Sequence, residues 1–197
     1  MATPRQLFSP RWPRWILAAA IGPLCWLGMM AVHEFGHVLG AWLSGAKVER
    51  LVLNPLGFSR TDVVGGQWPR LVIWMGPVIG TAIPALLWLV AHRSRTAYVF
   101  RFFAGVCLIS NGVYFASVFV QPIGDTADLL RAGESPWLMI LFGLPCIAAG
   151  LACWSGLAPS FGFGKEAKEV SPRVALGVLT LLVVIVVVEL ALLDPGM

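Results

Sequence analysis

An apolar run extends from residue 15 to residue 43, and its only acidic, basic or imidazole side chains are His33, Glu34 and His37. At about 1.5 Å per residue, a helix of this length exceeds a hydrocarbon core of about 30 Å. The run therefore indicates a helix that crosses a membrane. Gly22 and Pro23 leave two interpretations open: the helix breaks there, or it continues and tilts or protrudes from the bilayer.

Four more apolar runs follow the first. Hydrophobic residues form 58% of the 197 positions and charged residues form 12%, and the mean hydropathy is +0.81. This composition predicts an all-α, multi-pass membrane protein with about five transmembrane helices in a lipid bilayer. We place the later helices at about residues 71–91, 102–120, 136–158 and 174–193.

Charge and cysteine content argue against several other classes of protein. The first apolar run is too long for the core of a signal peptide, so we expect no cleaved signal. The net charge of +4 comes from Lys and Arg in loops and termini, where such residues set membrane topology, so we expect no nucleic-acid partner. The four cysteines lie in apolar stretches without CxxC spacing, and we interpret them as small buried side chains.

A short, membrane-associated β-hairpin is predicted between the first two helices. Residues 45–69 mix charged residues with glycine and proline, unlike the apolar runs on either side. Residues 48–53 and 58–64 are rich in β-type side chains, and turn residues separate them.

The polar residues of the first helix form the motif HExxH. His33 and His37 are four residues apart, which places both imidazoles on one face of a helix. Two imidazoles at this spacing can bind one Zn²⁺ ion, and Glu34 between them can reach a water molecule beside the ion. Ionisable side chains inside a membrane helix are functional candidates, so the motif suggests a metalloprotease site within the bilayer.

A catalytic zinc needs a third protein ligand. The candidates are His92, Asp125, Asp128 and Glu189. His92 is typical of a solvated loop, and Glu189 of a side chain near the far interface. Asp125 and Asp128 are three residues apart and can share one helix face, although either can also stabilise the start of a helix. The residues alone leave both carboxylates open.

With these motifs the chain resembles the site-2 protease family of intramembrane zinc metalloproteases, and in particular its small divergent branch. The resemblance rests on His33-Glu34-x-x-His37, the hairpin-like segment 45–66, Met75-Gly76-Pro77, and Asn111 with Pro122 and Gly124-Asp125. The family's usual Asn-x-x-Pro followed by Asp-Gly is absent. Asn111 lies eleven residues before Pro122, and Thr126 follows Asp125.

The resemblance implies a zinc-dependent endopeptidase that cuts membrane proteins in or near their transmembrane segments, in regulated intramembrane proteolysis. Zn²⁺ would be held by His33, His37 and Asp125, with Asp128 as the alternative third ligand. Glu34 would be the catalytic acid and base, and Asn111 a candidate contact to the substrate or the oxyanion. The hairpin would bind the unwound substrate by strand addition. A bacterial cell (inner) membrane is the expected location.

The expected organisation is a polar segment (1–14), a catalytic membrane core with three helices (15–135) and two additional helices (136–197). An alternative function is a non-catalytic membrane scaffold or binding protein that retains the zinc site. The sequence sets no oligomeric state. The orientation also stays open: Lys and Arg counts favour a cytoplasmic N-terminus, whereas the resemblance favours a cytoplasmic hairpin.

Overall fold

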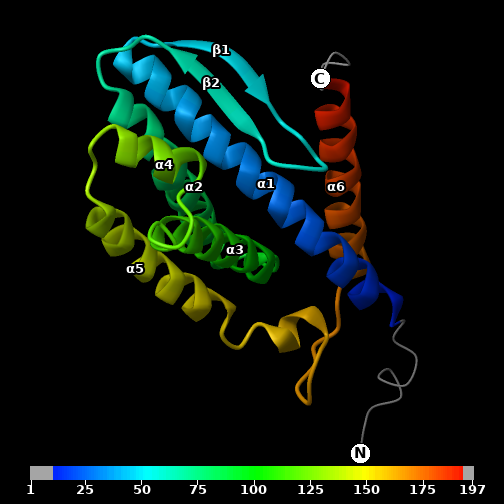
Figure 1. Ribbon diagram of the computed structural model, residues 1–197. Helices are drawn as coiled ribbons and strands as arrows, with labels where there is room; N and C mark the ends of the chain where they lie inside the picture. The colour runs from blue at the N-terminus through cyan, green and yellow to red at the C-terminus, as the bar shows by residue number, and fades with distance from the viewer. Residues whose placement is uncertain (1–10, 193–197) are drawn as a thin grey trace, which may run out of the picture.

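The computed structural model describes residues 11–192, and it confirms the predicted helical membrane fold (Figure 1). Five helices are long and apolar enough to cross a membrane. They are α1 (Trp12–Ser44), α2 (Pro69–Ala91), α3 (Ala97–Ala116), α5 (Pro136–Trp154) and α6 (Pro172–Leu192). Between them lie β1 (Lys47–Val52), β2 (Arg60–Val64), the short helix α4 (Gly124–Arg131) and a 3₁₀ turn (Ala158–Phe161).

The first helix continues through Gly22 and Pro23, which resolves the alternative left open by the sequence. A proline removes one hydrogen bond from a helix ladder. Here Ile21 and Cys25, on either side of the proline, are both buried in the cluster that α1 forms with α6. Packing on both sides of Pro23 keeps the helix continuous. Most of the predicted polar segment 1–14 and the last position of the predicted span 174–193 lie outside the described residues.

The third helix begins and ends earlier than the predicted 102–120. It begins earlier because Arg101 lies inside it and not in a loop, and it ends earlier because residues 117–120 form turns. Its guanidinium donates hydrogen bonds to the carbonyl oxygens of Ala152 and Ser155, at 3.0 and 2.9 Å. Terminal carbonyls of a helix need such donors. Arg101 therefore caps the end of α5 while it lies inside the first turns of α3.

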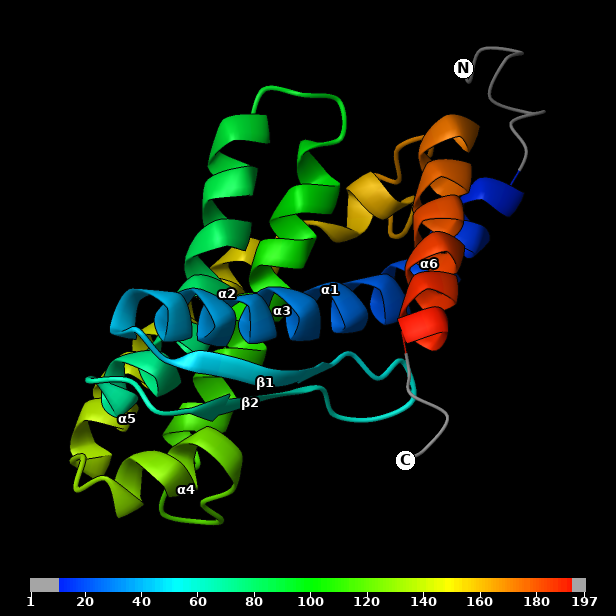
Figure 2. The same cartoon turned by 90° about the horizontal axis from the view of Figure 1, so that it is seen from above.

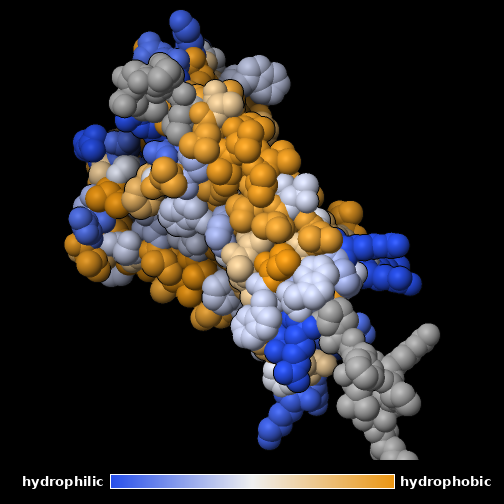
Figure 3. Space-filling view, turned by 90° about the vertical axis from the view of Figure 1, so that its right-hand side faces the viewer, coloured by the Kyte–Doolittle hydropathy of each residue, from blue (hydrophilic) through white to orange (hydrophobic). Residues whose placement is uncertain are grey.

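Glycines allow α3 and α5 to pack closely. A Cβ atom built on Gly112 would lie 2.8 Å from the carbonyl oxygen of Gly143, and one on Gly150 would lie 2.9 Å from that of Gly105. Small residues at such crossings let membrane helices approach each other. Apolar side chains cover much of the outer surface, and Figure 3 shows them as a broad band between hydrophilic ends.

The hairpin is antiparallel, as predicted, and runs back along α1 from its C-terminal end (Figures 1 and 2). Ala46 and Gln67 tie its base to the carbonyl oxygens of Ala41 and Ser44. Farther along, Phe58 meets Trp26 of α1 with ring centroids 6.0 Å apart. The hairpin thus covers the face of α1 that carries the HExxH motif.

The two ends of the bundle carry different elements. In Figure 2 the α2–α3 connection and the start of α6 lie at one end, while the hairpin and α4 lie at the other. The described connections therefore alternate between two ends, as expected for five consecutive crossings of a bilayer. A site formed by residues 33–37 of α1 would therefore lie toward the end of the bundle that carries the hairpin.

The close α3–α5 packing predicts that Gly112→Val destabilises the protein, because the added methyls would meet the backbone of Gly143. Overpacking of this kind costs about 1–3 kcal/mol. Gly177→Val on α6 is the matched control, because no heavy atom lies within 4 Å of a Cβ there. Thermal unfolding in detergent should show a lower Tm for the first variant only. Equal Tm values for the two variants would refute this packing.

Candidate metal centre

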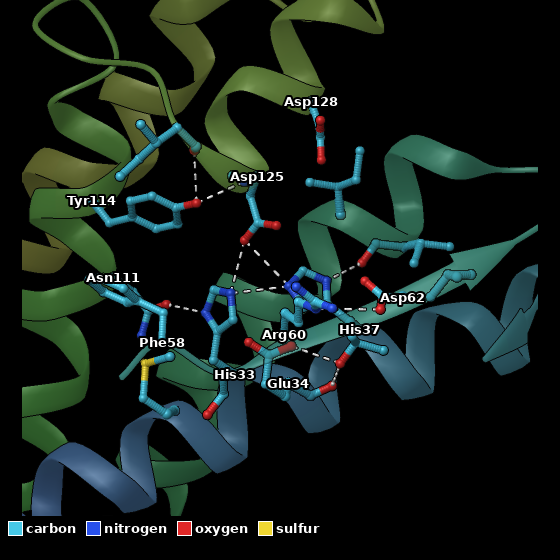
Figure 4. Close-up of a pocket in the computed structure, with 18 of the residues that line it drawn as sticks. His33, Glu34, His37, Phe58, Arg60, Asp62, Asn111, Tyr114, Asp125 and Asp128 are labelled. Atoms are coloured by element: carbon cyan, nitrogen blue, oxygen red, sulfur yellow. Dashed lines mark hydrogen bonds and ion pairs between the residues drawn. The ribbon is translucent and has the colours of Figure 1, made fainter. Parts of the chain in front are cut away.

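Three side chains from two separate segments converge on one point. His33 Nε2 lies 3.1 Å from His37 Nε2 and 2.9 Å from Asp125 Oδ2, and the third separation is 3.3 Å (Figure 4). Tetrahedral zinc with ligand bonds of about 2.0–2.2 Å requires ligand separations of about 3.3 Å. The observed triangle is close to that size, so these three atoms fit around a single zinc ion.

The hydrogen bond that Nδ1 makes fixes the tautomer of each imidazole. His37 Nδ1 lies 2.9 Å from the carbonyl oxygen of Val72, and His33 Nδ1 lies 2.7 Å from Asn111 Oδ1. The Asn111 amide is oriented by its nitrogen, which donates to the Cys107 carbonyl oxygen at 2.9 Å. Oxygens of this type only accept, so both Nδ1 atoms must donate.

Both Nε2 atoms therefore present lone pairs to the centre of the triangle, where they meet a carboxylate oxygen. Three acceptors that face each other need a cation or additional protons between them. Metal-binding histidines commonly donate their second N–H to a carbonyl or carboxylate group in this way. These three atoms could therefore hold a metal cation.

Asp125 lies in the first turn of α4, outside the five membrane-crossing helices. Burial disfavours its charge, whereas a proton or cation shared with the Nε2 atoms of His33 and His37 stabilises that charge and holds the pKa of this carboxyl below its ordinary value. The start of a helix also favours a negative charge. These effects favour the carboxylate form of Asp125, which is the form that would bind a metal ion.

The other candidate ligands lie elsewhere. Asp128 lines the same cavity, but its carboxylate pairs with Arg131 at 2.7 Å and does not reach the histidines. His92 bonds to the carbonyl oxygen of Leu89 at the C-terminal end of α2. Glu189 is buried on α6 and lies outside the triangle. Geometry thus favours Asp125 over the three alternatives, while its role as a ligand stays a prediction.

Glu34 lies beside the triangle and is 4% exposed. Thr61 of β2 donates a hydrogen bond to Glu34 Oε2 at 2.7 Å. Because the two residues are 27 positions apart in the chain, no local pattern in the sequence indicates their contact. The hairpin therefore supplies the group that orients this carboxylate.

Glycines bring α2 close to the two histidines. A Cβ atom on Gly76 would collide with the imidazole of His37 and come within 2.9 Å of His33 Nε2. On α1, a Cβ atom on Gly40 would lie 2.8 Å from the Cα of Val72. Glycine at the centre of the Met75-Gly76-Pro77 element thus leaves space for both imidazole rings and for the gap between them.

A cavity of about 830 Å³ opens over the triangle and Glu34. It is far larger than an ion and a few water molecules require, and it falls in the range of ligand-binding clefts. One part of the lining is apolar, with Trp26, Met29, Met30 and Phe58. Trp26 and Met30 precede His33 by about two turns and one turn of α1, so the cleft extends along that helix.

Five helices that can cross a membrane, together with a His/His/carboxylate group whose two histidines are buried, define an integral, multi-pass membrane protein with a candidate metal centre. The model of the peptidase M50B-like family matches residues 12–121, more than half of the chain. The protein therefore belongs to this family, which is a site-2 protease family. No curated protein and no solved structure matches the chain.

The family match includes both histidines, Glu34 and Asn111, and it ends before Asp125. Sequence reasoning did not single out Thr61, Val72 or Tyr114, each of which contacts a residue of the centre. Of these three, only Tyr114 could have been found from the sequence, because it lies three positions after Asn111 and shares its helix face.

The geometry predicts different results for the two aspartates. Asp125→Ala should lower the zinc content of the purified protein from one ion per chain to near zero, because it removes one of three ligands. Asp128→Ala is the matched control and should keep the wild-type content. Elemental analysis after metal loading measures both variants. The opposite pattern would assign the third ligand to Asp128.

Proposed function

We propose that this protein is a zinc-dependent intramembrane endopeptidase that hydrolyses peptide bonds in or near transmembrane segments of other membrane proteins. The observation that carries this proposal is the convergence of His33, His37 and Asp125 beside the buried carboxylate of Glu34, within a cavity between membrane helices. Membership of a site-2 protease family supports it.

The proposed chemistry assigns one task to each side chain. A zinc ion, when bound, polarises the scissile carbonyl group and acidifies a water molecule. Glu34 accepts the proton of the attacking water and transfers it to the leaving amine. Thr61 holds Glu34 in place through its hydrogen bond to Oε2. His33, His37 and Asp125 fix the ion.

The position of Asn111 supports an orienting role. Its oxygen receives the Nδ1 proton of His33, and its nitrogen donates to the Cys107 carbonyl oxygen. Asn111 is also only 2% exposed, so a substrate has little access to its amide. We therefore assign it the task of holding His33 in the metal-binding tautomer, in preference to a contact with the substrate or the oxyanion.

The cleft suits an extended peptide. A helical substrate hides its peptide bonds in its own hydrogen bonds, so it must unwind before it is cut. Strand addition to the hairpin would satisfy the freed backbone groups. The apolar part of the cleft, near Trp26 and Phe58, matches the apolar side chains of a transmembrane segment. We propose the bacterial inner membrane as the location and residues 15–135 as the catalytic core.

Glu34→Gln tests the mechanism. The variant should bind zinc as the wild type does, but cleavage should fall by a factor of about 10²–10⁴ because the general base is lost. Glu166→Gln is the matched control, since Glu166 is exposed in the loop before α6. The two variants and the wild type are compared by zinc analysis and by accumulation of uncleaved precursors in the membrane proteome. Identical proteomes, with zinc bound in all three, would favour the non-catalytic scaffold.

Cysteine labelling tests the arrangement in the membrane. Arg60 on the hairpin and Arg95 in the α2–α3 connection lie at opposite ends of the bundle. Arg60→Cys and Arg95→Cys should therefore react with a membrane-impermeant maleimide from opposite faces, with the parent protein as background. Charge counting expects Arg60→Cys to react from outside, whereas the family resemblance expects the cytoplasmic face. Reaction of both from one face would contradict the five-crossing arrangement.

A further inference from the structure

Tyr114 of α3 contacts the segment that carries Asp125, and no step of the proposed hydrolysis uses it. We propose that Tyr114 is a positioning residue that holds Asp125 in the metal centre and thereby sets how tightly the centre binds zinc. The inference rests on the proposed function, since it assumes that the His33, His37 and Asp125 group binds zinc.

The Tyr114 hydroxyl joins the residues on either side of Gly124. It donates a hydrogen bond to the carbonyl oxygen of Ile123 at 3.0 Å and accepts one from the backbone N–H of Asp125 at 2.7 Å (Figure 4). A single oxygen thus fixes the backbone on both sides of residue 124. Because the Asp125 side chain is short, fixing its backbone also fixes where its carboxylate can reach.

Gly124 leaves room for this hydroxyl because it has no side chain. Its φ of +48° lies in the left-handed region, which disfavours other residues. A Cβ atom there would also lie 2.5 Å from the Tyr114 oxygen, which is closer than Cβ atoms come to other heavy atoms in proteins. The position is therefore restricted to glycine by the backbone and by the tyrosine, independently of the two hydrogen bonds.

The rest of α4 is anchored at other points. Thr126 closes the first turn by a hydrogen bond from its hydroxyl to the Ile123 carbonyl oxygen at 2.8 Å, and Leu129 is fully buried. Arg70 of α2 donates from Nε to the Ala132 carbonyl oxygen at 3.0 Å. These contacts keep α4 docked when the Tyr114 hydroxyl is removed, so that the N-terminal turn with Asp125 loses one of its constraints while the rest of α4 keeps its own.

One helix face then orients ligands from two segments. Asn111 fixes His33, and Tyr114, three residues later on α3, fixes Asp125. The Tyr114 ring is also 6.3 Å from the imidazole of His33, centroid to centroid. α3 therefore sets the distance between the two ligands, although it supplies neither of them.

The test is Tyr114→Phe in the full chain, purified in detergent. Loss of a residue that orients a metal ligand commonly weakens metal binding by about 10–100-fold. We expect a zinc affinity lower by that factor, measured by competition with a chelator. A Co²⁺ titration should show a changed visible absorption band, because that band reports the geometry of the ligands. Tyr98→Phe, the same change in the cluster between α1, α3 and α6, is the matched control and should leave both readouts unchanged.

A double-mutant cycle separates the hydroxyl from general effects on folding. Gly124→Ala should weaken zinc binding through the strained backbone and through collision with the Tyr114 oxygen. In the Tyr114→Phe background the collision is absent, so Gly124→Ala should cost less affinity than it does alone. Equal costs in both backgrounds would refute a direct contact between the two residues.

The outcomes distinguish this inference from the proposed function. If the wild type binds zinc, and Tyr114→Phe shows the same affinity and the same Co²⁺ band, the role of Tyr114 alone is overturned. Failure of the wild type to bind either metal would overturn the proposed function, and the inference with it. An unchanged Tm for Tyr114→Phe without metal, together with weaker binding, would support positioning over a loss of folding.

Discussion

The tautomers of the two histidines are the constraint on which the rest of the structure depends. Each Nδ1 donates to a fixed oxygen, the Val72 carbonyl for His37 and the Asn111 amide for His33. Both Nε2 lone pairs must then point at the same place. In an apolar helix such groups need partners. The positions of α2, α3 and α4 around α1 satisfy that need.

Each element around α1 supplies one part of the centre. α2 contributes the Val72 carbonyl oxygen and, at Gly76, the space for the imidazoles. The hairpin contributes Thr61, which is bonded to Glu34. α4 contributes Asp125. Close approach through glycines is what makes this possible, because a larger residue at position 76 would occupy the place of the ligand atoms.

The sequence was sufficient for the local parts of this arrangement. The length of the apolar runs predicted the five helices, and β-type residues predicted the hairpin. The HExxH motif identified His33, Glu34 and His37 as candidate site residues. Spacing did not decide between Asp125 and Asp128, since both fit one helix face and only tertiary packing separates them. The start of α3 was misjudged because Arg101 binds the end of another helix, a contact that no local pattern reveals.

The wide separation of the ligands in the chain has a consequence for biosynthesis. His33 and His37 are made early, and Asp125 follows His33 by 92 residues. A nascent chain that has completed only α1, α2 and α3 carries both imidazoles without the carboxylate. In the proposed enzyme, metal capture must therefore wait until the helical core has been inserted and α4 has docked on it. For that proposed activity, the order of the ligands along the chain would keep an unfinished molecule from hydrolysing its neighbours in the membrane.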